Sequence, residues 1–437
     1  MADLHRTIEA LWRIESAKLI ARLARMVRDV GLAEDLAQDA LVAALEAWPR
    51  SGVPDNPGAW LMATAQNRAR DKLRRNQRLQ QKLDQYGRDR GEALESHHPD
   101  FVADLDRPIE DDLLNLVFTA CHPVLSPEAR AALTLRVLGG LSTGEIARAY
   151  LVSEPAMAQR IVRAKRTLTE ARVPVETPGG DELAQRLGAV LEVIYLIFNE
   201  GYSATSGDDW VRPALCDEAL RLGRILAALM PQASEVYGLV ALMEIQASRI
   251  PARTGPQGEP VLLLDQNRAR WDQMLIRRGL AALEAAERTN PGRALGPYAL
   301  QASIAACHAR ALQASETRWE TIAALYDALA QVQPSPVVEL NRAVAVAMAY
   351  GPGAGLDLAD ALRADPALAN YHWLPSVRAD LLLKLGRRTE AEAEFRRAAD
   401  LTRNVRERAL LLDRAAEAAT PAPTGPEGPR ETPEAFR

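Results

Sequence analysis

The chain has 437 residues, of which 48% are hydrophobic and 25% are charged, so we expect two to four domains of a soluble globular protein. Aromatic residues make up only 5%, and the abundance of Ala, Leu and Arg predicts an all-α fold rather than a sandwich or barrel. The three cysteines, Cys121, Cys216 and Cys307, are far apart, which excludes a disulfide framework and a Cys-x-x-Cys zinc site. We expect a cytoplasmic protein, because no apolar stretch is long enough to cross a membrane.

The net charge of −5 conceals a strong local contrast. Residues 60–90 hold nine basic and three acidic residues, whereas residues 91–112 hold eight acidic residues and one arginine. A basic block followed by an acidic segment predicts a surface for a polyanion and a linker that does not bind to it.

Clusters of Pro and Gly divide an otherwise helical pattern into parts. We expect a first helical region at 1–90, an acidic linker at 91–110 and a second region at 111–173. A short linker at 174–182 leads into a helical extension at 183–310 and a body of paired helices at 311–420. The last segment, 421–437, contains five prolines and two glycines and is predicted to be disordered.

The first region contains a basic helix, predicted at 60–75, that could bind phosphates. Leu61, Ala65, Ala69 and Leu73 share the face expected to be buried, and the cations lie on the other faces. The loop before this helix, at 56–60, is rigid and ends in Trp60, which suits an unstacked base. An earlier helix, at 33–48, collects the acidic side chains of Asp35, Asp39 and Glu46 on one side. These acids either dock a basic protein surface or are solvated acids that favour a helix N-terminus.

The second region predicts a helix-turn-helix. Ser142 and Glu145 have the spacing of a capping box, and Ser153 caps the next helix, whose first turn holds Pro155. That second helix has an apolar stripe, which consists of Met157, Ile161, Ala164 and Leu168. Another face presents Gln and Arg side chains, which are able to bond adenine and guanine in the major groove. A solvated basic face is the alternative interpretation.

The order and spacing of these motifs resemble the extracytoplasmic-function (ECF) group of bacterial RNA polymerase sigma factors. Residues 31–41, 56–61 and 67–71 look like sigma region 2, and residues 125–130 with the helix-turn-helix look like sigma region 4. The acidic linker in place of a region 3 also fits that group. The resemblance implies a promoter-specific initiation factor with no enzyme activity, no cofactor and no metal.

The resemblance also implies roles for individual positions. Binding to core RNA polymerase, through its β′ clamp and β flap, would involve Asp35, Gln38, Asp39 and Glu46. The −10 element would be bound by Asn56, Trp60, Asn67, Arg68, Arg70, Arg74 and Arg75. The −35 element would be bound by Ser153, Ala156, Gln159, Arg160, Arg163, Lys165 and Arg166.

The C-terminal part of the chain is similar to an ECF subgroup with a long helical extension. Residues 378–398 resemble a tetratricopeptide repeat, in which small residues allow paired helices to cross closely, and such a surface suits a protein partner. Carboxylates at Glu192, Glu200, Asp208 and Asp209 could suggest an enzyme, but buried caps and turns explain them better.

Two other classes of function remain open from the sequence. The chain could be an ordinary helix-turn-helix regulator with a ligand-sensing helical domain, which would bind promoter DNA without polymerase. It could also be a repeat scaffold, which would bind proteins without promoter specificity.

Overall fold

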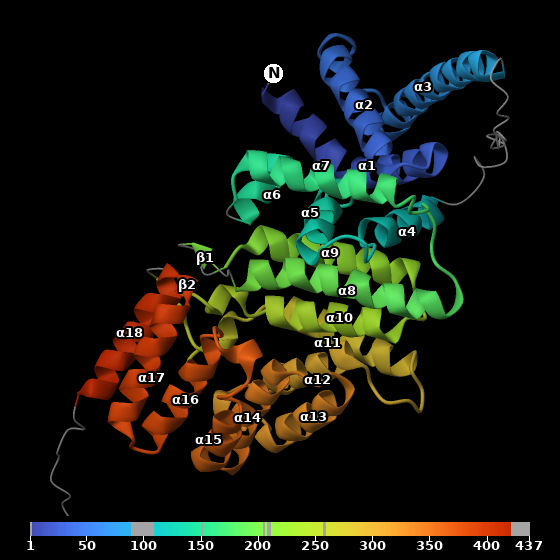
Figure 1. The fold of residues 1–437 in the computed structure, drawn as a ribbon. Coiled ribbons are helices and arrows are strands. Elements are labelled where there is room, and N and C mark those ends of the chain that lie inside the picture. The colour runs from blue at the N-terminus through green and yellow to red at the C-terminus, as the bar shows by residue number, and fades with distance from the viewer. Residues whose placement is uncertain are drawn as a thin grey trace, which may run out of the picture. The chain divides into compact units, whose positions relative to one another are not determined.

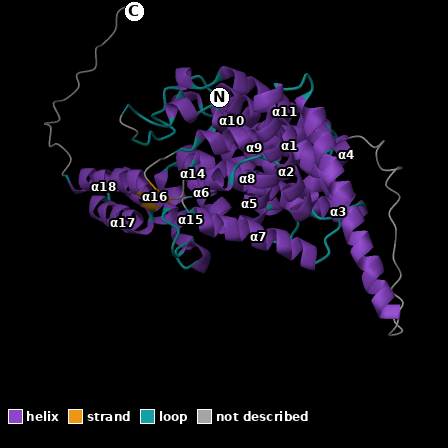
Figure 2. Ribbon diagram, turned by 90° about the horizontal axis from the view of Figure 1, so that it is seen from above, coloured by secondary structure: helices purple, strands orange, loops and turns teal. Residues whose placement is uncertain are grey.

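The computed structural model describes residues 2–88, 109–150, 152–203, 206–207, 211–256 and 259–420. Helices make up most of these residues, which confirms the all-α prediction (Figure 2). Most of the predicted acidic linker, the predicted tail, and Asp208 and Asp209 lie outside the described residues. The chain forms two compact units: residues 1–205, 211–252 and 267–309 make the first, and residues 206–210, 253–266 and 310–437 make the second.

The first unit contains the two predicted sigma regions and most of the extension (Figure 1). The predicted sigma region 2 contains α1 (Ala2–Val27), α2 (Val30–Ser51) and α3 (Pro57–Arg88). The predicted sigma region 4 contains α4 (Ile109–Ala120), α5 (Pro127–Val137), α6 (Thr143–Ala149) and α7 (Glu154–Glu170). The extension adds α8 (Gly180–Tyr202), α9 (Pro213–Leu229), α10 (Ser234–Ala247), η1 (Ile250–Ala252), η2 (Arg268–Arg270), α11 (Gln273–Arg288) and α12 (Pro297–Arg310).

Side-chain caps determine where the helices of the helix-turn-helix begin. The Ser142 side chain accepts from the Glu145 N–H while the Glu145 carboxylate accepts from the Ser142 N–H, so the predicted capping box is confirmed. Ser153 caps α7 in the same way, with Pro155 in the first turn, where a missing N–H leaves no helical bond unmade.

One continuous hydrophobic core runs through the two predicted sigma regions and α8–α10 of the extension. The predicted stripe of α7, from Met157 to Leu168, is buried. In α3, Leu61, Ala65 and Ala69 are buried as predicted, whereas Leu73 is only half-buried. The burial of these stripes packs each predicted DNA-binding helix against its own region with its polar face outward.

The second unit is a succession of helices in which each of α13–α18 packs on the next. Its elements are β1 (Ser206–Gly207), η3 (Ala314–Glu316), α13 (Trp319–Val332), α14 (Pro336–Tyr350), α15 (Pro352–Ala361), η4 (Pro366–Leu368), α16 (Trp373–Lys384), α17 (Arg388–Leu401), β2 (Arg403–Asn404) and α18 (Val405–Ala419). The two strands pair in parallel and are only two residues long, too short to give an alternating pattern in the sequence.

Candidate nucleic-acid and polymerase interface

The base-binding loop predicted at 56–60 proves to be the start of a helix. Pro57 is the first residue of α3, where its fixed φ angle suits a helix. Asn56 stands directly before it, and its side-chain oxygen accepts from the Ala59 N–H at 3.0 Å. Trp60 therefore lies in the first turn of α3, and its ring packs edge-on against the buried Trp48, with 5.4 Å between the ring centroids.

The remaining predicted −10 residues lie along α3. Asn67, Arg70 and Arg74 are exposed, and their spacing of three and four residues places them on one side of the helix. The exposed Arg75 lies on the adjoining side. Arg68 is half-buried and pairs with Asp39 of α2 at 3.5 Å, so it connects the predicted −10 and polymerase surfaces.

The predicted polymerase residues share the solvent side of α2. Asp35, Asp39 and Glu46 are exposed and Gln38 is half-buried. Two of the acids already have partners within the chain, because Asp39 pairs with Arg68 and Asp35 lies 3.4 Å from the Lys165 ammonium. The acidic side of α2 therefore touches residues predicted to bind DNA.

The structure divides the predicted −35 residues into two groups. In the N-terminal half of α7, Ala156, Gln159 and Arg163 are exposed, beside the half-buried Arg160 and the capping Ser153. In the C-terminal half, the exposed Arg166 pairs with Glu170 at 2.6 Å, and Lys165 turns toward α2. The exposed polar face of the N-terminal half is of the kind that enters a major groove.

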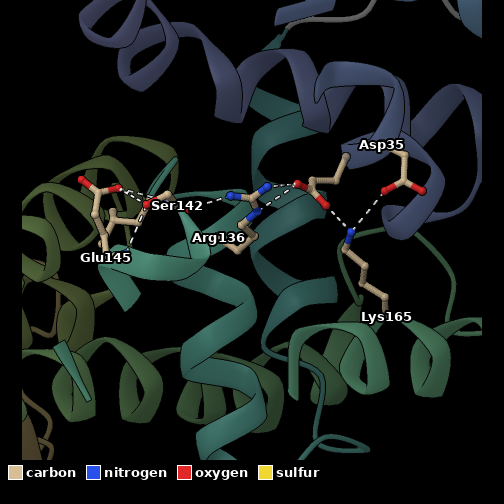
Figure 3. A network of polar contacts seen from close by, with 7 residues as sticks. Asp35, Arg136, Ser142, Glu145 and Lys165 are labelled. Atoms are coloured by element: carbon tan, nitrogen blue, oxygen red, sulfur yellow. Dashed lines mark hydrogen bonds and ion pairs between the residues drawn. The ribbon is translucent and has the colours of Figure 1, made fainter. Parts of the chain in front are cut away.

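The sequence analysis missed Glu34, which lies at the contact between α2 and α7. Its carboxylate, 4% exposed, accepts from the Arg136 guanidinium at 2.7 Å and from the Lys165 ammonium. Burial alone would raise the pKa of Glu34, but Lys165 and Arg136 outweigh that effect and hold the pKa below its usual range. Figure 3 shows Asp35, Arg136 and Lys165 converging here. Glu34 keeps helical register with the buried Val30 and Ala37, which was the available signal.

A second buried carboxylate links the same two regions, but here the predicted region 4 supplies the acid and the predicted region 2 supplies the cations. Asp112 of α4 has a fully buried side chain, 3.0 Å from the Arg22 guanidinium and 3.1 Å from that of Arg25, both in α1. Burial is the dominant influence and raises the pKa of Asp112 above its usual value, against the lowering effect of the two arginines.

The extension contacts the predicted region 4 through arginines that reach helix ends. Arg186 of α8 donates to the Phe118 carbonyl at 2.9 Å, and Arg221 of α9 donates to the Leu138 carbonyl at 2.6 Å. Arg212 donates to the Ala149 carbonyl. These acceptors stand at the C-terminal ends of α4, α5 and α6 respectively, where carbonyls lack a helical partner and the helix dipole favours a cation.

The two described carboxylates that could have suggested an enzyme, Glu192 and Glu200, have structural partners. Glu192 pairs with Arg130 of α5 at 3.3 Å, and Glu200 pairs with Arg212. Within the described part of the chain, no group of His, Cys, Asp and Glu side chains is arranged to hold a metal ion. No helix in the described ranges combines the length and apolarity that crossing a bilayer requires.

Three protein families match separate parts of the chain. Sigma-70 region 2 matches residues 12–79, and sigma-70 region 4 matches residues 116–168. A family of unknown function (DUF6596) matches residues 186–287, in the extension. The two sigma-70 matches confirm the sigma regions that the motifs predicted. The third match says nothing of tetratricopeptide repeats, which stay a prediction for 311–420.

Two relatives match the chain to different extents. An uncharacterised protein of Rhizobium meliloti (strain 1021), R00370, is 44% identical over 412 residues, which cover 92% of this chain and 94% of that protein. The probable ECF RNA polymerase sigma factor SigI of Mycobacterium tuberculosis is 29% identical over 170 residues, which cover 39% of this chain and 57% of that protein. The similarity to R00370 therefore includes the extension.

Proposed function

We propose that this chain, which belongs to the same family as the Rhizobium meliloti protein R00370 and carries sigma-70 regions 2 and 4, is an ECF-type sigma factor. It binds core RNA polymerase and directs initiation at promoters that have a −35 and a −10 element. It has no covalent chemistry of its own, since the polymerase makes the RNA, and it works in the cytoplasm.

The observation that carries this proposal is the presence of two separate cation-bearing helices, one in each sigma region. In α3 the exposed Arg70, Arg74 and Arg75 form a row that suits the phosphates beside a −10 element. In α7 the exposed Gln159 and Arg163 are the side-chain types that bond adenine and guanine edges. Two such surfaces on one chain suit a factor that recognises two promoter elements.

The proposed polymerase contact is the acidic side of α2. Asp35 and Asp39 carry their charges into solvent, with 71% and 59% of each side chain exposed. Exposed carboxylates on one helix side suit a basic surface such as the β′ clamp, and region 4 would contact the β flap. Such charges mainly govern the rate and specificity of association.

For the C-terminal helices α13–α18 we propose a regulatory role through a protein partner. The stacking of each of α13–α18 on the next supports tetratricopeptide-like repeats, which offer an extended surface for a protein or peptide. Deleting 311–437 should then change the response of promoter activity to conditions in cells. An identical response without these residues would contradict this role.

Run-off transcription with purified core RNA polymerase and a promoter library tests the sigma assignment. We expect initiation at discrete sites that share a −35/−10 pair, and only when the protein is added. The double variant Asp35→Lys/Asp39→Lys should lose polymerase binding while keeping its charge-dependent affinity for DNA. Glu284→Lys, which reverses an exposed acid of α11, is the matched control. Binding to duplex promoter DNA without any dependence on polymerase would favour the helix-turn-helix regulator instead.

A further inference from the structure

Two arginines have a backbone conformation that glycine adopts elsewhere in this chain. Among the described residues other than glycine, Arg28 and Arg172 have positive φ angles, of 52° and 50°. Glycine holds comparable positions after α2 and α14, at Gly52 and Gly351. A residue with a Cβ is disfavoured in this left-handed region, and such residues cluster at ligand sites. The two arginine side chains therefore require an explanation.

Both arginines stand where a helix ends. Arg28 directly follows α1, and Arg172 follows the C-cap of α7. The N–H of Arg172 donates to the Thr169 carbonyl and the next N–H donates to the Leu168 carbonyl, both at 3.0 Å. This pair of bonds is a Schellman motif, in which the left-handed position is usually glycine. Glycine would make the same backbone bonds with less strain, so the side chain is what an arginine adds.

The two arginines line one cleft of the first unit. A hollow of about 270 Å³ is lined in part by Arg28 and Arg172, and a larger hollow of about 770 Å³ adjoins it. Arg28, Pro174 and Val175 line both hollows. We name the two hollows together the arginine cleft. The larger hollow alone has the size of small-molecule sites, which is roughly 300–1,000 Å³.

Both guanidiniums are available to an anion. The side chains of Arg28 and Arg172 are exposed, and neither forms an ion pair or a hydrogen bond with a described residue. The adjacent acid, Asp29, is already occupied. Its carboxylate accepts from the Leu32 N–H at 2.7 Å and from the Thr169 hydroxyl at 2.8 Å. Two cations that line one hollow without a carboxylate partner suit a phosphate, which a guanidinium binds through paired hydrogen bonds.

The larger hollow indicates what else the ligand carries. Its lining includes the carboxylates of Asp111 and Glu176, which accept hydrogen bonds from hydroxyl groups but repel further phosphates. We propose that the arginine cleft binds a small phosphate ester that carries hydroxyl groups, with its phosphate at Arg28 and Arg172. A nucleic-acid strand suits this lining less well, because every nucleotide brings another phosphate.

The arginine cleft lies apart from the surfaces of the proposed sigma function. Neither Arg28 nor Arg172 belongs to the residues proposed for the polymerase, the −10 element or the −35 element. A bound ligand would contact the ends of α1 and α7 and the segment 174–177 that leads into α8. Occupancy should therefore stabilise the first unit against thermal unfolding. This readout needs neither polymerase nor promoter, so the cleft and the sigma function fail independently of each other.

Thermal unfolding of the full-length protein in inorganic phosphate, at constant ionic strength, tests the site. We expect a saturable rise of the midpoint, by roughly 2–4 °C once phosphate exceeds its Kd about fivefold. Phosphate also strengthens apolar burial in every protein, so the comparison between variants is decisive. Arg28→Gln/Arg172→Gln should abolish the saturable rise. Arg293→Gln/Arg363→Gln, which removes two exposed arginines elsewhere, should keep it. An equal rise in all three proteins would overturn the proposal.

The variant Arg28→Gly/Arg172→Gly distinguishes a ligand site from a structural role. Glycine relieves the left-handed strain, so this variant should unfold at a higher temperature than the parent protein when phosphate is absent. It should also lose the saturable rise with phosphate. A lower midpoint would mean that the arginines are kept for stability, and it would contradict the inference drawn from their backbone.

Two further probes decide the class of ligand. Ribose 5-phosphate should reach half of its effect at a lower concentration than inorganic phosphate, because its hydroxyl groups enter the larger hollow. Asp111→Asn/Glu176→Gln should remove that advantage. Equal potency of the two probes would overturn the assignment of a hydroxyl-bearing ester. A single-stranded oligonucleotide that binds the parent protein but not Arg28→Gln/Arg172→Gln, without any saturable response to phosphate, would assign the cleft to nucleic acid instead.

Discussion

Region 4 makes two contacts within the first unit that differ in chemistry. Toward region 2, the polar groups are charged on both sides: two buried carboxylates, Glu34 and Asp112, each pair with two cations. Toward the extension, the cations Arg186, Arg212 and Arg221 donate to neutral main-chain carbonyls. Apolar side chains surround both contacts, which belong to one hydrophobic core.

This difference concerns the polar groups that each contact would leave behind. Separating regions 2 and 4 would return buried charges to water, where hydration offsets much of the lost attraction. Separating the extension would leave three helix ends without their caps, and both separations would expose apolar surface.

Removing the extension should have the largest effect. A fragment of residues 1–175 would expose the side chains of region 4 that face Val190, Ile194 and Leu222. Burying each of these three side chains contributes ~1.5–3 kcal/mol. We expect this fragment to aggregate or to lose cooperative thermal unfolding, as followed by circular dichroism, whereas residues 1–309 should unfold cooperatively. A fully folded 1–175 fragment would show that region 4 does not need the extension.

A single truncation in the extension contact should lower stability. Ile194 is 3% exposed, and replacing it with Ala should lower the free energy of unfolding by ~2–5 kcal/mol. Urea unfolding measures this loss. An unchanged free energy of unfolding would mean that the Ile194 side chain contributes nothing to the contact.

Removing a single helix-end contact should have a smaller effect. In Arg186→Met the apolar stem of the side chain is largely retained, but the Phe118 carbonyl loses its donor. A buried acceptor left unsatisfied costs ~1–3 kcal/mol, so thermal unfolding should shift to lower temperature. Arg288→Met is the control, because that side chain is 69% exposed and its pairing with Glu284 is at the surface. Equal shifts in the two variants would show that the helix-end contact contributes no more to stability than a surface ion pair.

The features that the sequence predicted correctly depend on residues that are close together along the chain. The capping box at Ser142 and the buried stripe of α7 follow from local spacing, and both are present. The start of α3 was placed three residues late, because Trp60 was assigned to a loop although Pro57 is a favourable first residue of a helix. These features involve residues within about one helical turn of each other.

The parts that could not be predicted depend on residues far apart in the sequence. Glu34 looked like one more solvated acid, because its partners Arg136 and Lys165 are more than a hundred residues away. No local pattern marks the Phe118 carbonyl as the acceptor of Arg186, 68 residues later. The sequence thus indicated the two sigma regions, whereas the contacts between them required the structure.

The smallest effect on stability is expected at Asp35, which differs from its neighbour Glu34 mainly in exposure. Asp35 and Glu34 are adjacent carboxylates that pair with the same ammonium group, but Asp35 is 71% exposed and Glu34 is 4% exposed. An exposed ion pair contributes ~0–1 kcal/mol, so Asp35→Asn should leave the unfolding midpoint almost unchanged. The affinity for core polymerase is the second quantity to measure. The same substitution should weaken binding to core polymerase, because its charge belongs to the proposed docking surface. Measuring both quantities on Asp35→Asn and Glu34→Gln separates the two roles. The first variant should lose polymerase affinity with little loss of stability, and the second should lose stability, because it removes the buried carboxylate that Arg136 and Lys165 share. If the unfolding midpoints of the two variants fall equally, exposure does not distinguish the two carboxylates.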